Sequence, residues 1–283
     1  MSTGQSELPP TITLTTDFGL SDSYVGQIKG VIIGISPQAR IVDISHGVLP
    51  QQIRQATFLT QAAWPCFSSR TIHVAVVDPG VGSDRRAIVL RTPQAVFVGP
   101  DNGVLSAALP DDLRPDEPHQ VPLPDDVNAF EISNPRYMRE PVSKTFHGRD
   151  VFAPAAAHLA LGIGAEELGA PLQTVMALPP IQAAQHADGT FEAQVVHIDR
   201  FGNVISDIRS QDLPAGGFTV EAGGRIMRGP FGTYAELDGL GALVGSSGYL
   251  ELAAPNANAA RLLDLEIGAP VRLQPDESGH ATK

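Results

Sequence analysis

The feature that most constrains the fold is an alternation of short apolar runs with amphipathic stretches between residue 11 and about residue 165. The short runs are rich in β-branched residues, as buried strands are, and the longer stretches repeat their apolar residues at helical spacing. Such alternation is typical of an α/β domain, here expected to be Rossmann-like with a central, mostly parallel sheet. The predicted strands are TITLTT, IVDIS, TIHVAVV and a hairpin of AIVLRT and AVFVGP, and the predicted helices are DSYVGQIKGVIIGI, QQIRQATFLTQAAW and FAPAAAHLALG.

Beyond residue 190 the pattern changes to short strands separated by glycine-rich turns, with one short helix, NAARLL. This pattern predicts a small β-barrel or a sandwich, of which we expect the barrel. A solvated insertion loop is expected at residues 110–128, which are rich in Asp and Pro. The predicted division is a disordered N-terminus at 1–10, an α/β domain at 11–172, a linker at 173–190, a β-barrel domain at 191–276 and a disordered tail at 277–283.

Composition narrows the class of protein. A chain of 283 residues that is 42% hydrophobic can bury a sizeable core, and no run of about 18 apolar residues or signal-peptide pattern occurs. A net charge of −12 without a large basic cluster argues against nucleic acid and against an anionic membrane surface as partner. The single cysteine, Cys66, cannot form an internal disulfide and is expected to be a packed thiol, so we expect a cytoplasmic protein.

Each predicted strand of the first domain ends in polar residues and glycine. Helix capping and turn chemistry explain any one of these ends. In an open α/β sheet, however, ligands bind beyond the carboxyl ends of the strands, so four such ends at one edge favour a shared site. The four strand ends are Thr16-Asp17-Phe18-Gly19, Ser45-His46-Gly47, Asp78-Pro79-Gly80 and Gly99-Pro100-Asp101-Asn102-Gly103.

Several common motifs are absent or lack their context. The DFG at 17–19 comes without the other kinase motifs, and neither G-x-G-x-x-G, nor a P-loop, nor a G-x-S-x-G elbow occurs. The histidines do not fall at metal-ligand spacings such as H-E-x-x-H, so no metal site is expected.

What remains at the sheet edge is a carboxylate, a guanidinium and an imidazole. Asp78 and Arg85 flank a loop whose glycines, Gly80 and Gly82, let the backbone fold back, so the two side chains could meet. His147 lies just before the helix FAPAAAHLALG. A structural salt bridge between Asp78 and Arg85 fits the spacing as well as a catalytic pair does.

In the second domain, HIDRFGNVISDI places Asp199, Phe201 and Asn203 around a strand turn. An aromatic ring beside an amide suits a purine, which stacks on the ring and hydrogen-bonds the amide. An Asx turn with a core phenylalanine is the alternative. Farther on, Ser246, Ser247 and Asn256 lie in loops able to bind polar ligand groups.

Taken together, six ordered blocks resemble the S-adenosylmethionine (SAM) hydroxide adenosyltransferase family, the SAM hydrolases related to the fluorinase and chlorinase. The resemblance extends from residue 11 to about residue 260, and it implies a homotrimer with SAM held between the first domain of one subunit and the second of its neighbour. The blocks are TTDFGLSDSYVGQIKG, VDISHGV, VVDPGVGSDRR, VGPDNG, TFHGRDVFAPAAAHLA and IDRFGNVISDI.

The resemblance also implies roles for residues. Asp78, Arg85 and His147 match the family's water-activating triad, and SAM is the substrate with no cofactor. Asp17 would take the ribose hydroxyls with Asp22 close by, Phe201 and Asn203 the adenine, and Asp199 and Ser246 the methionine amine and carboxylate. Ser247 stands where some relatives have arginine. The remaining expected substrate-binding residues are Phe18, Gln51, Phe146 and Asn256.

Three positions depart from the halogenating branch of the family, which the resemblance associates with a tyrosine, a serine and a tryptophan. Here these positions hold Asp78, Gly148 and Gln51. A carboxylate would repel a desolvated halide, so the expected reaction is attack of water on C5′ of SAM, giving adenosine and L-methionine. The alternatives are a SAM-dependent halogenase and a non-catalytic SAM or adenosine binder. Arg86 is expected to be structural.

Overall fold

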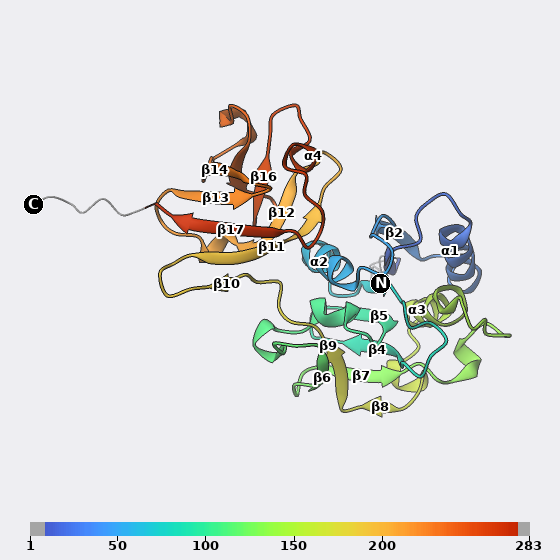
Figure 1. Cartoon of the computed structure of the whole chain (residues 1–283). Helices are drawn as coiled ribbons and strands as arrows, with labels where there is room; N and C mark the ends of the chain where they lie inside the picture. The colour runs from blue at the N-terminus through green and yellow to red at the C-terminus, as the bar shows by residue number, and fades with distance from the viewer. Residues whose placement is uncertain (1–8, 277–283) are drawn as a thin grey trace, which may run out of the picture. The chain divides into compact units, whose positions relative to one another are not determined.

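The computed structural model describes residues 9–276, which form two compact units, the first ending at Pro180 and the second beginning at Ile181 (Figure 1). Each unit is described by itself. The terminal segments 1–10 and 277–283 lie outside the described residues except for Pro9 and Pro10. The carbonyl oxygen of Pro10 accepts a hydrogen bond of 2.8 Å from the Arg40 backbone N–H.

The first unit alternates strands and helices as predicted through its first hundred residues. The predicted helices and strands of the first unit are all present, with ends shifted by at most two residues. The strands and helices are β1 (Thr11–Thr16), α1 (Tyr24–Ile35), β2 (Arg40–Ser45), α2 (Ile53–Ala63), β3 (Ile72–Val76), β4 (Ala87–Arg91), β5 (Val96–Pro100), β6 (His119–Pro122), β7 (Asn128–Glu131), α3 (Ala153–Ala160), β8 (Pro171–Leu172) and β9 (Thr174–Ala177).

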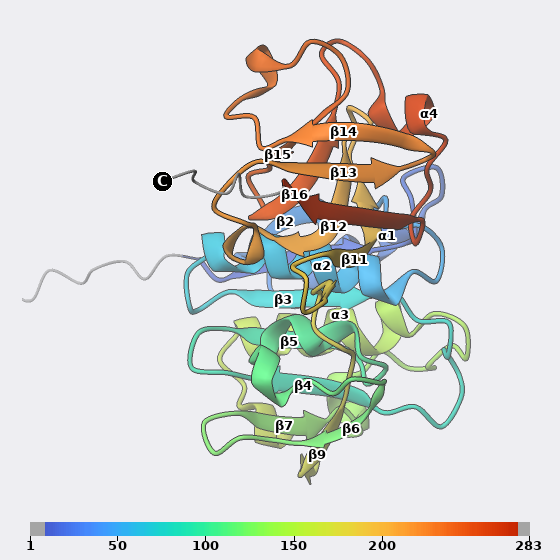
Figure 2. The same ribbon diagram turned by 60° about the vertical axis from the view of Figure 1, so that its left-hand side comes forward.

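A seven-stranded sheet in the order β2-β1-β3-β5-β4-β7-β8 forms the centre of this unit (Figure 2). Strands β2, β1, β3 and β5 are parallel to one another, while β4, β7 and β8 pair antiparallel. The alternation predicted a mostly parallel sheet. This prediction is confirmed for the half of the sheet that carries the polar strand ends.

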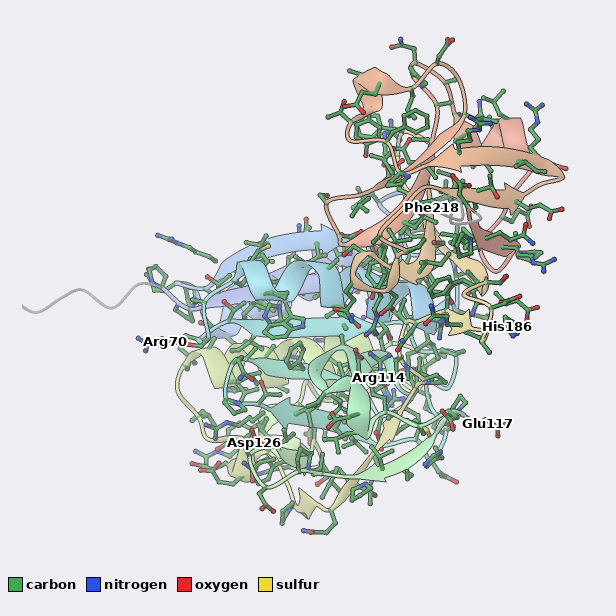
Figure 3. All side chains as sticks on the ribbon, turned by 90° about the vertical axis from the view of Figure 1, so that its left-hand side faces the viewer. Arg70, Arg114, Glu117, Asp126, His186 and Phe218 are labelled. Carbon is green, nitrogen blue, oxygen red and sulfur yellow. The ribbon has the colours of Figure 1, made fainter. Side chains whose placement is uncertain are left out.

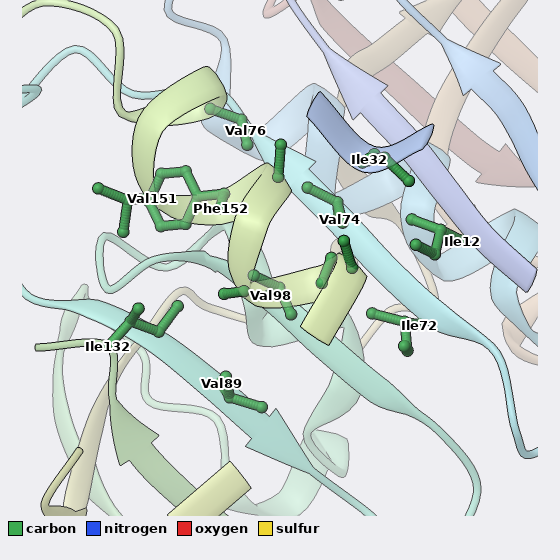
Figure 4. Close-up of a cluster of buried hydrophobic side chains, with 14 of the residues drawn as sticks. Ile12, Ile32, Ile72, Val74, Val76, Val89, Val98, Ile132, Val151 and Phe152 are labelled. Atoms are coloured by element: carbon green, nitrogen blue, oxygen red, sulfur yellow. The ribbon is translucent and has the colours of Figure 1, made fainter. Parts of the chain in front are cut away.

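The alternation of side chains along each strand divides the core between the two faces of the sheet. In β3, Val74 packs with α1 and α3 residues in one cluster, and Ala75 packs with α2 residues in another. Figure 4 shows the first of these clusters, which includes Ile12 of β1, Ile32 of α1 and Val74 of β3. Helices therefore cover both faces, and only the edges and the connecting loops are left for a site.

Two segments of the first unit are more ordered than predicted. Residues 110–128 contain β6, which pairs with β9, although β9 lies within the stretch 173–190 that was expected to be a linker. Arg114 in this segment is buried and donates to the carbonyl oxygens of Leu178 and Pro179, whereas Glu117 and Asp126 are exposed (Figure 3). Most of the segment is exposed, as predicted, but the prediction of a loop was wrong for β6 and for buried Arg114, because their partners lie far later in the chain, at residues 174–179.

The prediction of a packed Cys66 thiol is also wrong, since Cys66 is exposed. Helix α2 ends at Ala63, and a short 3₁₀ turn with Pro65 in its first positions follows at Trp64–Cys66. Proline cannot supply the backbone N–H that would continue the helix, so the chain leaves the helix axis before the thiol.

The second unit is a nearly closed, antiparallel, barrel-like sheet in the order β14-β13-β17-β11-β12-β16-β15, with β10 added to β11. A bridge from Phe231 to Leu243, with a 2.9 Å hydrogen bond from the Phe231 N–H to the Ala242 carbonyl, draws the two ends of the sheet together. The barrel prediction is confirmed at this level. The elements are β10 (Ala184–Gln185), β11 (Phe191–Ile198), β12 (Val204–Arg209), β13 (Phe218–Ala222), β14 (Arg225–Gly229), β15 (Gly241–Val244), β16 (Tyr249–Ala253), α4 (Ala259–Leu263) and β17 (Pro270–Pro275).

Candidate functional site

The polar ends of the four parallel strands do lie along one edge of the sheet. After β1, the Gly19 N–H donates to the carbonyl oxygen of His46, which follows β2, at 2.8 Å. After β5, Asn102 Nδ2 donates to the carbonyl oxygen of Val77, at the end of β3, also at 2.8 Å. These bonds join the end of β1 to that of β2 and the end of β5 to that of β3, so the four turns form two bonded pairs along the edge.

At this edge the structure brings together Asp78, Arg85 and His147. Nε of Arg85 donates to Oδ1 and Oδ2 of Asp78 at 2.9 and 3.0 Å, and Nη2 donates to Oδ2 as well. The same Nη2 lies 2.7 Å from Nδ1 of His147. The side chain of Asp78 is 6% exposed and that of Arg85 is 10% exposed, so the guanidinium joins a carboxylate and an imidazole with little water around it.

The loop between Asp78 and Arg85 is held against the segment that leads to His147. Gly82 has φ of +79°, and a Cβ there would collide with the carbonyl oxygen of Lys144. Only glycine tolerates both that backbone angle and that approach. The close packing of these two loops is what allows residues 62 positions apart to share one hydrogen bond.

A buried carboxylate that sequence reasoning did not single out organises the chain beside His147. Asp150 is fully buried and accepts hydrogen bonds from Nε of Arg149 at 2.7 Å, Nη1 of Arg139 at 3.2 Å and the backbone N–H of Ser143 at 2.9 Å. It lies in a π-helical turn, Gly148–Phe152, that precedes α3 where an ordinary helix start was expected. The adjacent Arg-Asp pair was the only sequence signal, because the other partners come from a separate loop.

The electrostatics fix the state of the imidazole. Burial, followed by the charge of Arg85, lowers the pKa of His147, against a smaller opposing effect of Asp78 and Asp150. His147 is therefore neutral at pH 7. Because arginine can only donate, Nδ1 of His147 accepts from Arg85 and the ring proton is on Nε2.

Aromatic rings line the neighbouring part of the edge. Phe146 packs edge-on against Phe18 and Tyr24, with ring centroids 5.7 and 5.1 Å apart, and Arg149 lies over its face. The Phe18 ring also approaches Gly148, where a Cβ would lie 3.2 Å from two ring carbons. Tyr24 was not among the predicted site residues.

The other predicted residues of this unit differ in their surroundings. Oδ2 of Asp17 accepts a 3.0 Å hydrogen bond from the backbone N–H of Gln51, which has φ of +68°. Asp22 is exposed. Arg86 belongs to a separate network, in which Nε donates to Asp101 at 2.9 Å and Nη2 to the carbonyl oxygen of Thr174 at the same distance. The two neighbouring arginines thus have different partners, as expected.

In the barrel-like unit, Asp199 holds its own turn. Its Oδ1 accepts from the N–H groups of Phe201 and Asn203 at 2.9 and 2.8 Å, and its Oδ2 accepts from Nδ2 of Asn203 at 3.1 Å. This is the Asx turn of the alternative interpretation, but the phenylalanine is not part of the core, since Phe201 is 76% exposed. The turn presents an aromatic face to the outside.

The remaining predicted residues of this unit lie in the loops around β16. Ser246 and Asn256 are exposed and Ser247 is half-buried. Sequence reasoning missed the pair beside them: the Tyr234 hydroxyl donates to Oε1 of buried Glu251 at 2.6 Å. Burial is the main cause that raises the pKa of Glu251. Burial is also the main cause that raises the pKa of Tyr234, to about 12.

Two kinds of feature are absent from residues 9–276, a cluster of metal-ligating side chains and a helix that could span a membrane. No group of three or more His, Cys, Asp or Glu side chains is arranged there to hold a metal ion. None of the helices there is both long and apolar enough to span a membrane.

Comparison with known proteins places these features in context. Models of the SAM hydroxide adenosyltransferase N-terminal and C-terminal domains match residues 12–169 and 193–272. The chain is 40% identical over 269 residues to the (R)-S-adenosyl-L-methionine hydrolase of Thermus thermophilus, covering 91% of this chain and 97% of that protein.

More distant similarities follow the same pattern. The (R)-S-adenosyl-L-methionine hydrolase of Methanocaldococcus jannaschii is 32% identical, with 90% and 92% covered, and the fluorinase of Nocardia brasiliensis is 26% identical, with 94% and 97% covered. Among solved structures, an uncharacterized conserved protein from Thermotoga maritima superposes with a TM-score of 0.81 at 31% identity. That match covers 93% of this chain and 99% of the other.

Proposed function

Since the chain belongs to the SAM hydroxide adenosyltransferase family, we propose that it hydrolyses S-adenosyl-L-methionine to adenosine and L-methionine. The observation that carries the proposal is the Arg85 guanidinium that joins Asp78 to His147 at the carboxyl edge of the sheet. An ion pair that served stability alone would not need the imidazole. The relatives named as SAM hydrolases, at 32–40% identity over most of the chain, support the same reaction.

The reaction is a substitution at C5′. The C5′–S bond breaks and its electron pair neutralises the sulfonium, so methionine leaves as a thioether without needing a general acid. A water oxygen forms the new bond to C5′ and loses one proton. The catalytic task is therefore to aim the water in line with the C–S bond and to give it hydroxide character.

The geometry supports a division of roles within the cluster. With its proton on Nε2, His147 donates a hydrogen bond to the water oxygen and cannot also take the water's proton at that atom. Asp78 retains free lone pairs beside the three hydrogen bonds from Arg85 and accepts the proton. Arg85 holds both groups in place, and its positive charge favours the hydroxide that forms.

Asp78 and Gly148 favour water over a halide ion as the nucleophile. The Asp78 carboxylate would repel a halide that has lost its hydration shell. A serine at Gly148 would place its Cβ within 3.2 Å of the Phe18 ring and would require the ring to move. The lower identity to the fluorinase than to the hydrolases supports this choice.

We propose the following contacts for SAM, with no metal or cofactor. Asp17, with Asp22 nearby, binds the ribose hydroxyls, and Phe18, Gln51 and Phe146 surround the sugar. Phe201 and Asn203 bind the adenine. Asp199 and Ser246 bind the methionine amine and carboxylate, with Ser247 and Asn256 in reach of polar groups. The binding residues are thus divided between an α/β unit, which we regard as Rossmann-like because of its carboxyl-edge site, and a barrel-like unit.

This division supports a homotrimer in which each site is completed by two subunits. In this arrangement, a neighbouring subunit with bound SAM covers the exposed Phe201 ring. We also propose a cytoplasmic location, which is consistent with an exposed, unpaired Cys66.

Incubation with SAM in oxygen-18 water tests the function. A chelator is present, and one arm contains added chloride or fluoride. We expect methionine and adenosine with the label in the 5′-hydroxyl, and the same products with halide. A 5′-halo-adenosine would assign the chain to the halogenases, and binding without products would assign it to the non-catalytic binders.

A further inference from the structure

Two threonines of strand β1 each form a buried pair with a histidine, and the two pairs are alike in geometry. Thr13 Oγ1 lies 2.8 Å from Nδ1 of His73, and Thr16 Oγ1 lies 2.8 Å from Nδ1 of His46. All four side chains are buried. The pairs differ in place, because Thr13 is in the middle of the strand and Thr16 is its last residue.

The second pair is connected to the turn that follows β1. The Phe18 N–H donates to Thr16 Oγ1 at 3.3 Å, and the Gly19 N–H donates to the carbonyl oxygen of His46 at 2.8 Å. Two of the three peptide groups that present Asp17 and Phe18 are thus held by Thr16 and His46. Since Thr16 Oγ1 accepts from Phe18, its own hydrogen is available for Nδ1 of His46.

The far side of the His46 ring faces a charged pair. Nε2 lies 3.1 Å from Oδ1 of Asp43, within ion-pair distance but without the alignment of a hydrogen bond. Lys29 Nζ lies 2.6 Å from Oδ2 of the same carboxylate. Partial burial raises the pKa of Asp43, but Lys29 and His46 together lower it below its ordinary value, so Asp43 is an anion. A carboxylate beside Nε2 favours the tautomer with its proton there, which leaves Nδ1 to accept from Thr16.

We propose that His46 and Thr16 are positioning residues that hold the Asp17–Gly19 turn in the shape that binds the adenosyl group. The proposal rests on the ribose-binding role proposed for Asp17. His46 does not touch the substrate. It acts through Thr16 and through its own carbonyl oxygen, and Asp43 fixes the orientation of its ring. Within residues 9–276, the Thr13–His73 pair has no such connection to the strand-end turns. Burial lowers the pKa of His73 to about 4, and its ring packs against Phe97.

The two pairs offer a matched experiment. Thr16→Val and Thr13→Val each remove one buried hydroxyl without changing the volume of the side chain. His46→Leu removes the ring donors and acceptors, whereas His46→Asn retains a polar group near the position of Nδ1. Each variant is measured for adenosine affinity by calorimetry, for KM and kcat with SAM, and for Tm.

We expect Thr16→Val and His46→Leu to raise both the adenosine Kd and the KM by about tenfold while kcat changes by less than about threefold. His46→Asn should recover most of the affinity. Thr13→Val should lower Tm and leave Kd and KM at their wild-type values. A Thr16→Val protein that behaves like Thr13→Val, with a lower Tm and unchanged Kd and KM, would overturn the proposal.

Adenosine binding separates this inference from the proposed reaction. If the wild-type protein binds adenosine but does not hydrolyse SAM, the proposed function fails while the affinities still test the turn. If the wild-type protein hydrolyses SAM and all four variants bind adenosine equally well, the positioning role fails and the function stands.

Discussion

The Asp78–Arg85–His147 cluster and the Asp199–Asn203 turn are two candidate ligand-contacting regions with opposite construction. In the cluster, the charged side chains are at most 10% exposed and are bonded to one another before any ligand arrives. In the turn, the side chain of Asp199 accepts hydrogen bonds from Phe201 and Asn203 of the same turn, and Phe201 is left 76% exposed. The first region is therefore ordered in advance, as the proposed reaction requires, whereas the second exposes an aromatic ring, as the proposed stacking of adenine requires.

This contrast has a kinetic meaning. Groups fixed around a reacting atom act mainly in the transition state, so their loss lowers kcat, while a stacking platform binds substrate and transition state alike, so its loss raises KM. Substitutions in the two regions should therefore separate cleanly along these two parameters.

The largest effect is expected for Asp78→Asn. The amide has nearly the shape of the carboxylate but cannot take a proton from water, so kcat should fall by about a thousandfold while KM stays within about threefold. Initial rates of adenosine formation over a range of SAM concentrations measure both parameters. An increase in KM as large as the loss in kcat would place Asp78 in binding and would erase the contrast.

A smaller effect follows from protonation of His147. Because its pKa is lowered from the ordinary 6.5, the neutral ring persists to below that pH. Protonation would remove the lone pair that accepts from Arg85 and place two cations side by side. The stability that the neutral ring contributes is complete above pH 6.5 and is lost as the pH falls through the lowered pKa.

Accordingly, kcat should be constant between about pH 7 and 8 and should decline only at a pH below the ordinary histidine value of 6.5. His147→Asn should lower kcat by about 10- to 100-fold and abolish this acid limb. A pH profile of kcat for the two proteins tests the assignment. The same limb in the variant would attribute the titration to another group.

For the platform, Phe201→Ala should raise the KM for SAM by about tenfold and change kcat by less than about twofold, as expected for loss of a base-stacking ring. Ile226→Ala is a control in the same unit, because Ile226 is equally exposed, at 74%. Steady-state kinetics and Tm are measured for both variants. If Phe201→Ala lowers kcat and leaves KM unchanged, the ring is not a binding platform.

The sequence predicted what depends on local pattern. The parallel strands and their polar ends follow from apolar periodicity and glycine, and the fold-back of the loop after Asp78 follows from Gly80 and Gly82. Prediction failed where distant segments decide the outcome. Arg114 is buried by carbonyl groups of residues 178 and 179, more than 60 positions later.

The same limit applies to the site. Asp150 accepts from Ser143 and Arg139, on a loop that has no regular period, and Glu251 accepts from Tyr234, which lies on the far side of strand β15 in the sequence. The adjacent arginine was the one sequence signal for Asp150, and Glu251 lies in an apolar strand run without a signal for its partner. Family resemblance supplied the roles of the predicted residues, and the contacts of these two additional carboxyls became visible only in three dimensions.

The smallest effect on activity is expected at the boundary of the cluster, where Arg86 follows Arg85. Arg86 donates to Asp101, whose side chain is 2% exposed. The Asp101 carboxylate also accepts a hydrogen bond of 2.7 Å from the Met176 backbone N–H. In Arg86→Gln, the carboxylate keeps this backbone partner and loses its counter-charge, so unfolding free energy should fall by about 1–3 kcal/mol. Because neither Asp78 nor His147 contacts Arg86, kcat and KM should remain within about twofold of wild type.

Urea unfolding and kinetics on the same preparation test this prediction, with Arg85→Gln as the counterpart that loses kcat. A tenfold loss of kcat in folded Arg86→Gln would extend the preorganised region to Asp101 and across the β5 strand end.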